Sequence, residues 1–306
     1  MYKFACMNTT IEAFDLPEDT QPKVEKLFHK SEQTLSRFNL SSELSQLNHS
    51  FQIPFICSSI LFEAVKIADF YYKKTNGVFN PYLGKQIASI GYDRSFEQIT
   101  TINIDSAHLC NLQEGKKNVS IHDGMKSITL KDNIHIDLGG IAKGWTAQCI
   151  KEVLKQDGHE FGVLVAGGDM VVWGLKNKKQ KIRLEHPSDK YTSICSFELI
   201  NDAGVATSSI MKRRWYSSEG KTYHHILDPK NFLPSNSDLQ QVSVIASTLT
   251  EAEVLTKCML VLGWQDGLSM LRKFRKPLAA IALTKRGEII SEGDLSHFIK
   301  GGSLVC

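Results

Sequence analysis

The sequence predicts an α+β fold of mixed sheets and packed helices. Segments with helical periodicity and short apolar strands follow one another without the regular strand–helix–strand alternation of a parallel sheet. With 42% hydrophobic and 23% charged residues, the 306-residue chain has the composition of a globular protein. Its length exceeds the usual size of a single core. The chain is therefore either one large domain or two closely packed lobes, and we expect residues 1–306 to form a single functional domain.

Four segments carry apolar residues at spacings of three and four, which predicts helices. They are residues 22–38, 59–74, 141–156 and, as a helix pair, 250–274. Thr20 is a candidate N-cap of the first, and Gly158 closes the third.

Short apolar or alternating runs predict the strands. They are residues 161–165, 194–199, 242–246 and 279–283. Residues 128–130 and 134–136 alternate as well, and we expect them to pair as a hairpin through Asp132-Asn133. That hairpin would lead into Gly139-Gly140.

Charge and cysteine content exclude several classes of protein. The net charge is +3 and Lys212-Arg213-Arg214 is the one compact basic run, so neither nucleic acid nor a membrane surface is expected as a partner. Seven scattered cysteines without C-x-x-C spacing argue against a disulfide framework or a zinc ribbon. The N-terminal residues lack an apolar stretch of signal-peptide length, and we expect a cytoplasmic protein.

The common nucleotide-binding and hydrolytic motifs are missing. Two glycine turns remain as candidates for phosphate binding. Gly139-Gly140 precedes an expected helix with Lys143 in its first turn, and bare amides beside a cation suit a diphosphate. Gly167-Gly168-Asp169 follows an expected strand in the same way. The alternative is a tight turn with a solvated lysine.

His225 stands three residues before Asp228 in a turn-prone stretch. This spacing is compatible with a ligand or proton-handling site. A zinc site or a Ser-His-Asp triad lacks a convincing third partner. The structural alternative is a polar turn in which Asp228 caps backbone amides.

Glu253 and Lys257 have structural interpretations of their own. Thr250-Glu251-Ala252-Glu253 matches a capping box at the start of a helix. Glu253 and Lys257 are spaced for a surface ion pair worth about 0.2–0.5 kcal/mol. Spacing alone favours these interpretations over metal binding.

Taken in order along nearly the whole chain, these segments resemble the ApbE family of FAD:protein FMN transferases. The matching segments are Met7-Asn8-Thr9, Leu35 to Phe38, Ser42 to Leu44, Thr75 to Pro81, Asp137 to Gly144, Gly167 to Asp169, Ala206 to Ser208, His225 to Pro229 and Ala252 to Gly263. The resemblance implies an ApbE-like fold and FAD as a substrate. It implies transfer of FMN to a threonine or serine hydroxyl of a target protein, with release of AMP.

The resemblance also implies a set of site residues. Those at the flavin would be Met7, Phe38, Val78, Phe79 and Asn80. Lys143 and His225 would contact FAD as the catalytic residues, with Asp169 and Thr207 nearby. A Mg²⁺ ion would be held by the main-chain carbonyl of Gly140 and by the side chains at Glu253 and Lys257.

The chain departs from the family pattern inside this site. Glu253 stands where the family commonly has aspartate, and Lys257 replaces a threonine. A protonated lysine has no acceptor for a metal, so either the metal is held without Lys257 or Lys257 replaces its charge. Gln148, Ser209 and Asn231-Phe232 stand where aspartate, glycine and Thr-Gly are frequent.

Three functions are compatible with this pattern. The first is an active, metal-dependent FMN transferase with a cytoplasmic acceptor protein. The second is a protein that binds FAD without transferring it, which the altered metal positions favour. The third is an FAD pyrophosphatase, in which water replaces the protein hydroxyl and free FMN is released.

Overall fold

The computed structural model describes residues 1–99, 119–131, 134–176, 178–189 and 191–303. The chain divides into two compact units, each assembled from separate stretches of sequence. The first unit consists of Met1–Phe28, Lys143–Lys212 and Asn236–Cys306, and the second of His29–Ala142 and Arg213–Ser235. The expected single functional domain over residues 1–306 stays a prediction.

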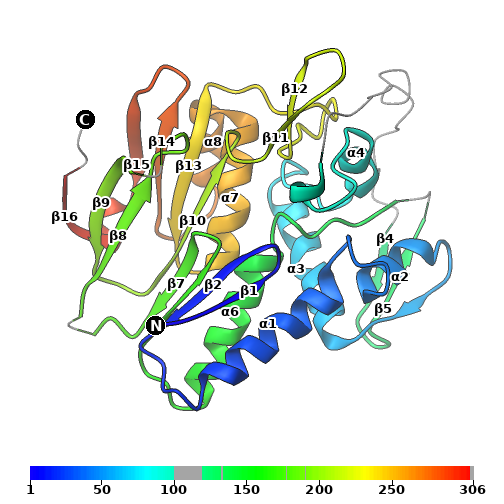
Figure 1. The fold of residues 1–306 in the computed structure, drawn as a ribbon, viewed down its shortest axis with the longest axis horizontal. Helices are drawn as coiled ribbons and strands as arrows, with labels where there is room; N and C mark the ends of the chain where they lie inside the picture. The colour runs from blue at the N-terminus through cyan, green and yellow to red at the C-terminus, as the bar shows by residue number, and fades with distance from the viewer. Residues whose placement is uncertain (100–118, 132–133, 177, 190, 304–306) are drawn as a thin grey trace. The chain divides into compact units, whose positions relative to one another are not determined.

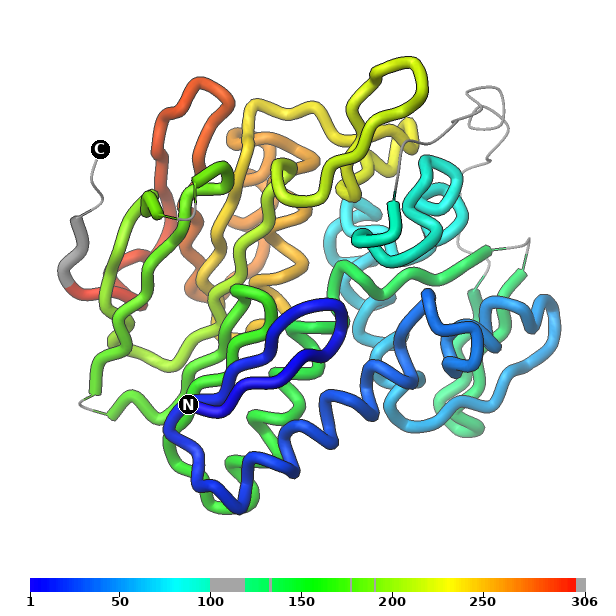
Figure 2. The backbone as a smooth tube through the Cα atoms, viewed as in Figure 1, coloured from blue at the N-terminus to red at the C-terminus, as the bar shows by residue number. Residues whose placement is uncertain are grey.

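An eight-stranded antiparallel sheet forms the centre of the first unit. In spatial order its strands are β1 (Tyr2–Cys6), β2 (Thr9–Phe14), β6 (Gly162–Ala166), β7 (Asp169–Trp173), β10 (Ala203–Ser209), β13 (Leu239–Ala246), β14 (Leu278–Thr284) and β15 (Ile289–Gly293). The colours in Figure 2 run from blue through green to orange across this sheet, because its strands come from distant parts of the chain. Pairing of β2 with β6 joins the N-terminal hairpin to the middle of the sequence.

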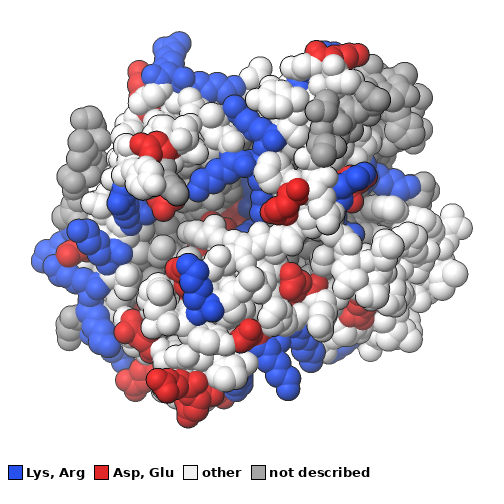
Figure 3. Space-filling view, in the orientation of Figure 1, with Lys and Arg blue, Asp and Glu red and all other residues white. Residues whose placement is uncertain are grey.

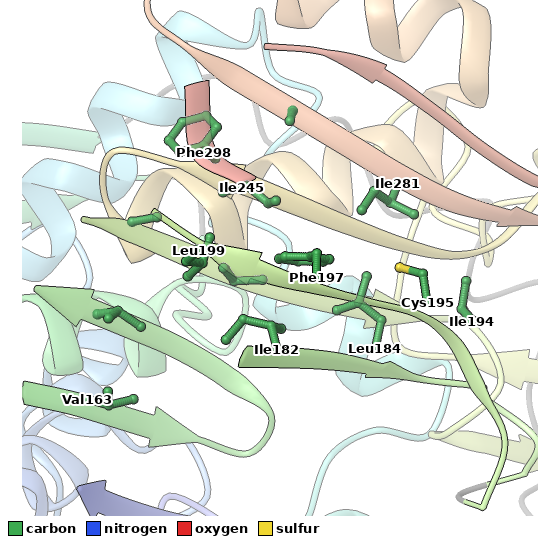
Figure 4. Close-up of a cluster of buried hydrophobic side chains, with 14 of the residues drawn as sticks. Val163, Ile182, Leu184, Ile194, Cys195, Phe197, Leu199, Ile245, Ile281 and Phe298 are labelled. Atoms are coloured by element: carbon green, nitrogen blue, oxygen red, sulfur yellow. The ribbon is translucent and has the colours of Figure 1, made fainter. Parts of the chain in front are cut away.

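A three-stranded sheet contributes to the main core of the first unit. It consists of β8 (Gln180–Glu185), β9 (Ser193–Leu199) and β16 (Ile299–Ser303). Figure 4 shows Phe197 and Leu199 of β9 in one cluster with Ile245 of β13 and Ile281 of β14. Phe298, from the short helix α9 (Leu295–Phe298), belongs to the same cluster. Burial of these side chains is the main stabilising contribution here.

The opposite face of β10 packs on helix α7 (Leu249–Leu262), as Figure 1 shows. Alternate residues of a strand point to opposite faces. Ala203 and Val205 lie in the core cluster, whereas the intervening Gly204 abuts Leu249 and Ser208 exchanges a hydrogen bond with Thr256 of α7 at 2.8 Å. Helices α6 (Ala142–Gln156) and α8 (Trp264–Leu271) complete this unit, and α1 (Gln21–Leu35) crosses its boundary.

The second unit combines several helices with two small sheets. Its helices are α2 (Glu43–His49), α3 (Ser59–Lys74), α4 (Gly84–Ser89) and the 3-10 turn η1 (Phe96–Gln98). Its strands are β3 (Phe55–Ile56), β4 (Val119–His122) and β5 (Ser127–Leu130) in one sheet, and β11 (Arg214–Tyr216) and β12 (Thr222–His224) in the other. One of its apolar clusters joins Ile90 and Tyr92 to Trp215 and Phe232.

The α+β prediction is confirmed. Helix α3 covers the predicted residues 59–74, with Ser58 as its N-cap and Leu61 and Val65 among its buried residues. Helix α1 ends three residues before the predicted end at residue 38. In α6 the predicted apolar position Cys149 is exposed.

The predicted hairpin of residues 128–130 and 134–136 is wrong. Strand β5 pairs with β3 and β4, and the connecting Asp132-Asn133 lies outside the described residues. The side chain of Asn48 accepts from the Ile136 N–H at 2.7 Å and donates to its carbonyl at 2.9 Å. This amide satisfies both backbone groups that a strand partner would have bonded.

The surface carries charged side chains of both signs. Lysine and arginine side chains and carboxylates both occupy the face shown in Figure 3, in keeping with a net charge of +3. The five cysteines in the described ranges are thiols. Among the described helices, none is both long and apolar enough to cross a bilayer.

We predict that Gly204→Ala destabilises the first unit. The added methyl carbon would lie 2.2 Å from the Leu249 nitrogen and 2.4 Å from its Cα, and these backbone atoms cannot rotate away. Overpacking of this kind costs about 1–3 kcal/mol. Urea unfolding should show the loss. Gly124→Ala is the matched control, because nothing lies within 4 Å of its added carbon, and an equal loss in both variants contradicts the prediction.

Candidate functional site

In the first unit a buried carboxylate, Glu253, binds two lysines and a backbone amide. Its side chain is 0% exposed. Oε1 accepts from Lys143 Nζ at 3.0 Å and from Lys257 Nζ at 3.3 Å. Oε2 accepts from the Gly144 N–H at 2.7 Å. A buried ionised carboxylate needs such partners, because burial without them is strongly unfavourable.

Both simple structural interpretations of Glu253 are corrected by this geometry. Helix α7 begins at Leu249 with Thr248 as its N-cap, and the Thr248 side chain accepts from the Glu251 N–H at 3.3 Å. The capping box predicted from Thr250 to Glu253 is therefore wrong. The ion pair of Glu253 with Lys257 exists, but it is buried and not on the surface.

Gly144 allows helix α6 to approach α7 closely. A Cβ at this position would lie 2.8 Å from Glu253 Oε2 and 3.0 Å from the Leu249 carbonyl oxygen. Gln148, one helical turn later, accepts from the Leu249 N–H at 3.0 Å. The departure from the family pattern at Gln148 thus has a structural role in joining α6 to the start of α7.

The glycine turn before α6 is less open than the sequence suggested. In the second unit Gly139 N–H donates to Asp137 Oδ1 at 2.6 Å, and the Ile141 N–H donates to the Leu138 carbonyl at 3.0 Å. Gly140 itself is partly exposed. In the first unit the Gly144 N–H binds Glu253. These amides are engaged by the protein, so the lysines of the first unit are its stronger anion-binding groups.

Two tight hairpins in the first unit carry Met7 and precede Asp169. Met7 and Asn8 form the two-residue β1–β2 turn with φ of 54° and 53°, as type I′ turns require. Gly167 and Gly168 form the β6–β7 turn with φ of 66° and 95°. The two turns adjoin, because a Cβ at Gly167 would lie 2.5 Å from Thr9 Oγ1.

Asp169 begins β7 and is buried. Its Oδ1 accepts from the Thr207 N–H at 2.8 Å. The Thr207 hydroxyl instead exchanges a hydrogen bond with Ser243 at 2.8 Å. By strand alternation from Val205, the Thr207 side chain points away from α7. Thr207 therefore acts on Asp169 through its backbone.

The pKa values of Glu253 and Asp169 are shifted in opposite directions by their surroundings. Burial favours neutral Glu253, but Lys143, Lys257 and the Gly144 N–H outweigh it and lower the pKa of Glu253 to about 2. Burial dominates at Asp169 and, with repulsion from Glu253, raises its pKa to about 6 against the pull of the two lysines. Burial also lowers the pKa of Lys257, which the two carboxylates oppose. Glu253 is thus the permanent anion.

The second unit groups aromatic rings around Arg37. The guanidinium carbon lies 4.1 Å from the Phe38 ring centroid and 4.9 Å from that of Tyr92. Arg37 Nε also pairs with Asp137 Oδ2 at 3.0 Å. Tyr92 packs edge-on against the ring of His225, with centroids 6.4 Å apart. Two predicted residues, Phe38 and His225, therefore contact one tyrosine.

The remaining predicted flavin residues follow α3 in the second unit. Phe79 is 6% exposed and its N–H donates to Thr75 Oγ1 at 3.0 Å. Asn80 Oδ1 accepts from the Tyr82 N–H at 3.0 Å, and Val78 is partly exposed. These contacts order the loop, and contact with flavin stays a prediction.

Asp228 confirms the predicted polar turn after His225. Its Oδ1 accepts from the Lys230 N–H at 2.9 Å.

Sequence reasoning missed Tyr92 and assigned no role to Arg37 or Asp137, although both charged residues lie in the segments quoted for the resemblance. Opposite charges in two such segments were the available signal for their pairing.

The predicted sites are thus assembled as two groups. Lys143, Asp169, Glu253 and Lys257 come together in the first unit, and Phe38 and His225 share Tyr92 in the second. The convergence of all of them on one diphosphate stays a prediction.

The side chains at the implied metal site do not fit Mg²⁺. This ion takes oxygen ligands in near-octahedral geometry at about 2.0–2.1 Å. One oxygen of Glu253 accepts from two ammonium groups and the other from an amide. Protonated Lys257 supplies donors and no lone pair. A divalent cation would have to displace both lysines from the only carboxylate implied for it.

This α+β fold, with its charged residues on α6 and α7, is that of the ApbE family. The family model matches residues 7–282, and the chain belongs to this family.

Relatives with an assigned activity cover most of the chain. The "FAD:protein FMN transferase" of Treponema pallidum is 26% identical over 269 residues, which are 81% of this chain and 72% of that protein. A protein of the same name from Klebsiella pneumoniae is 26% identical over 285 residues, covering 92% of this chain and 87% of its own.

Solved structures share the fold at low identity. The ApbE protein of Thermotoga maritima superimposes with a TM-score of 0.86 at 21% identity, over 98% of this chain and 99% of that one. The flavin transferase ApbE of Vibrio cholerae gives 0.78 at 21% identity, over 97% of each chain. The predicted ApbE-like fold is confirmed.

We predict that Glu253→Gln destabilises the first unit by about 3 kcal/mol, the cost of removing one partner from a buried ion pair. The change leaves two lysines, 17% and 15% exposed, without their shared anion. Urea unfolding measures the loss. Glu152→Gln on α6 is the control, because Glu152 is 52% exposed. Equal stability of both variants contradicts this role.

We predict that the stability contributed by Asp169 falls as the pH rises. The folded chain keeps this proton up to a pH of about 6, whereas the ordinary aspartate pKa is 3.8. The contribution is therefore full below about pH 4 and is lost as the pH rises through about 6. Urea unfolding across this range should show the advantage of the wild type over Asp169→Asn shrinking. A difference that stays constant with pH contradicts the shift.

Proposed function

We propose that this protein is an FAD:protein FMN transferase that moves FMN from FAD to a threonine or serine hydroxyl of a target protein. The observation that carries the proposal is membership of the ApbE family over residues 7–282. Relatives from Treponema pallidum, Klebsiella pneumoniae and Escherichia coli are named FAD:protein FMN transferase. The paired lysines of the first unit support it, because they suit a diphosphate ligand.

The proposed reaction is a phosphoryl-type transfer. The acceptor oxygen forms a bond to the phosphorus on the FMN side of the diphosphate. The bond from that phosphorus to the bridging oxygen breaks, and AMP leaves with that oxygen and its electron pair. The hydroxyl proton passes to a base. Negative charge grows on the departing phosphate, so nearby cations lower the barrier.

We assign roles to three residues in this reaction. Lys143, in the first turn of α6, binds the diphosphate and stabilises the charge that develops on it. Glu253 holds that ammonium in place at 3.0 Å. His225 handles the proton of the attacking hydroxyl, a role suited to imidazole near neutral pH. Tyr92 packs against the ring of His225 and also contacts the ring of Phe38.

One assay separates this function from its alternatives. The chain is incubated with FAD and candidate acceptor proteins, and AMP, free FMN and protein-bound FMN are measured. AMP together with protein-bound FMN supports transfer. AMP with free FMN indicates a pyrophosphatase, and bound FAD without turnover indicates a binding protein. Comparing host proteins by mass spectrometry, with and without this chain, identifies the acceptor through its FMN adduct.

We predict that Lys143→Ala weakens FAD binding by about tenfold, equivalent to about 1.4 kcal/mol. The change removes the cation of α6 that contacts Glu253. Fluorescence titration with FAD measures the affinity. Lys155→Ala, an exposed lysine in the last turn of the same helix, should bind FAD as the wild type does. Unchanged affinity in Lys143→Ala contradicts the assigned role.

A further inference from the structure

We infer that the ammonium group of Lys257, held beside Lys143 by Glu253, supplies the positive charge for the diphosphate of FAD in place of a divalent metal ion. This inference rests on the proposed function and deepens it. It makes FAD binding by this chain independent of Mg²⁺.

The first support is the state of the Glu253 carboxylate. Its two oxygens accept three hydrogen bonds, from Lys143, Lys257 and the Gly144 N–H, at 3.0, 3.3 and 2.7 Å. All three donors carry positive charge or the positive end of a helix dipole. The carboxylate is therefore neutralised by the protein itself, and a divalent ion would bring a fourth source of positive charge to the same oxygens.

The second support is the position of Lys257. Besides Glu253 Oε1, its Nζ also donates to the Glu253 main-chain carbonyl at 3.1 Å. Two of the three N–H groups of the ammonium thus fix it over the preceding turn of α7, which leaves one N–H for a further acceptor. Its side chain is 15% exposed. An ammonium fixed in this way is preorganised, as a bound metal ion would be.

The third support is the charge of the group. Lys143 and Lys257 contribute two positive charges, and Glu253 removes one. Lys143, Lys257 and Glu253 together therefore carry one net positive charge without any metal. The neighbouring Asp169, whose pKa burial raises to about 6, offsets this charge increasingly as the pH rises. A diphosphate bound there would gain two fixed donors of positive charge.

The close approach of the helices makes this arrangement rigid. Gly144 admits the Glu253 side chain to the first turn of α6, where a Cβ would lie 2.8 Å from Oε2. Gly204 likewise allows the Leu249 backbone, at the start of α7, to lie against β10. Glu253 and Lys257 are consequently set between a sheet and a helix terminus.

The test measures FAD affinity of the full chain by fluorescence titration after dialysis against EDTA, and again with added Mg²⁺. We expect the two dissociation constants of the wild type to agree within about twofold. Lys257→Met should weaken FAD binding about tenfold in EDTA. Lys257→Arg should restore most of it, because arginine keeps the charge at every accessible pH and cannot act as a neutral amine.

A double variant provides the converse test. Glu253→Asp with Lys257→Thr replaces an ammonium by an oxygen ligand beside a shorter carboxylate, a set that Mg²⁺ prefers. We expect its FAD affinity to rise about tenfold on addition of Mg²⁺. Electron paramagnetic resonance with Mn²⁺ as the probe should show one bound ion in its FAD complex and none in the wild-type complex. Thermal unfolding verifies that each variant is folded. If the double variant does not fold, Lys257→Met and Lys257→Arg still provide the test.

The outcomes separate this inference from the proposed function. Wild-type FAD binding that collapses in EDTA and returns with Mg²⁺ overturns the inference alone, as does one Mn²⁺ ion per wild-type chain. Wild-type affinity in folded Lys257→Met also overturns it. An absence of FAD binding under both conditions overturns the proposed function, and the inference with it.

Discussion

The buried carboxylate of Glu253 is the interaction on which the charged site of the first unit depends. It bonds to the first turn of α6 through Lys143 and the Gly144 N–H, and to its own helix through Lys257. A carboxylate that is 0% exposed remains ionised only with such partners. Its charge thus positions two lysines that would otherwise repel one another. The structure and the proposed chemistry rely on the same contact.

Glycines create the space that this contact requires. At Gly144 a side chain would strike Glu253, and at Gly204 it would strike the backbone of α7. At Gly167 it would meet Thr9, where the two hairpin turns adjoin. In each place the neighbouring atoms, which are backbone at Gly204 and mainly side chain at Gly144 and Gly167, lie closer than a Cβ permits. The glycines of these turns and segments therefore serve helix and strand packing as well as candidate phosphate binding.

The second unit uses a different arrangement, in which a cation lies among aromatic rings. Arg37 contacts Phe38 and Tyr92 and pairs with Asp137, which also accepts from the Gly139 N–H. The segments around residues 37 and 137 are a hundred residues apart in the chain, and this ion pair joins them. This ion pair thereby joins the glycine turn before α6 to the aromatic cluster that contains Tyr92, which packs against His225.

Local patterns in the sequence were sufficient for the α+β class and for helices such as α3, because helical periodicity and an N-cap at Ser58 act within a few residues. They were not sufficient for residues 134–136, where the backbone of Ile136 is satisfied by Asn48 from far along the chain. The role of Glu253 required tertiary structure for the same reason, since Lys143 lies 110 residues away. Periodicity reports which face of a segment is buried. Only the folded chain determines which charged groups contact that face. Burial then makes an ion pair that would be weak at the surface into a strong constraint.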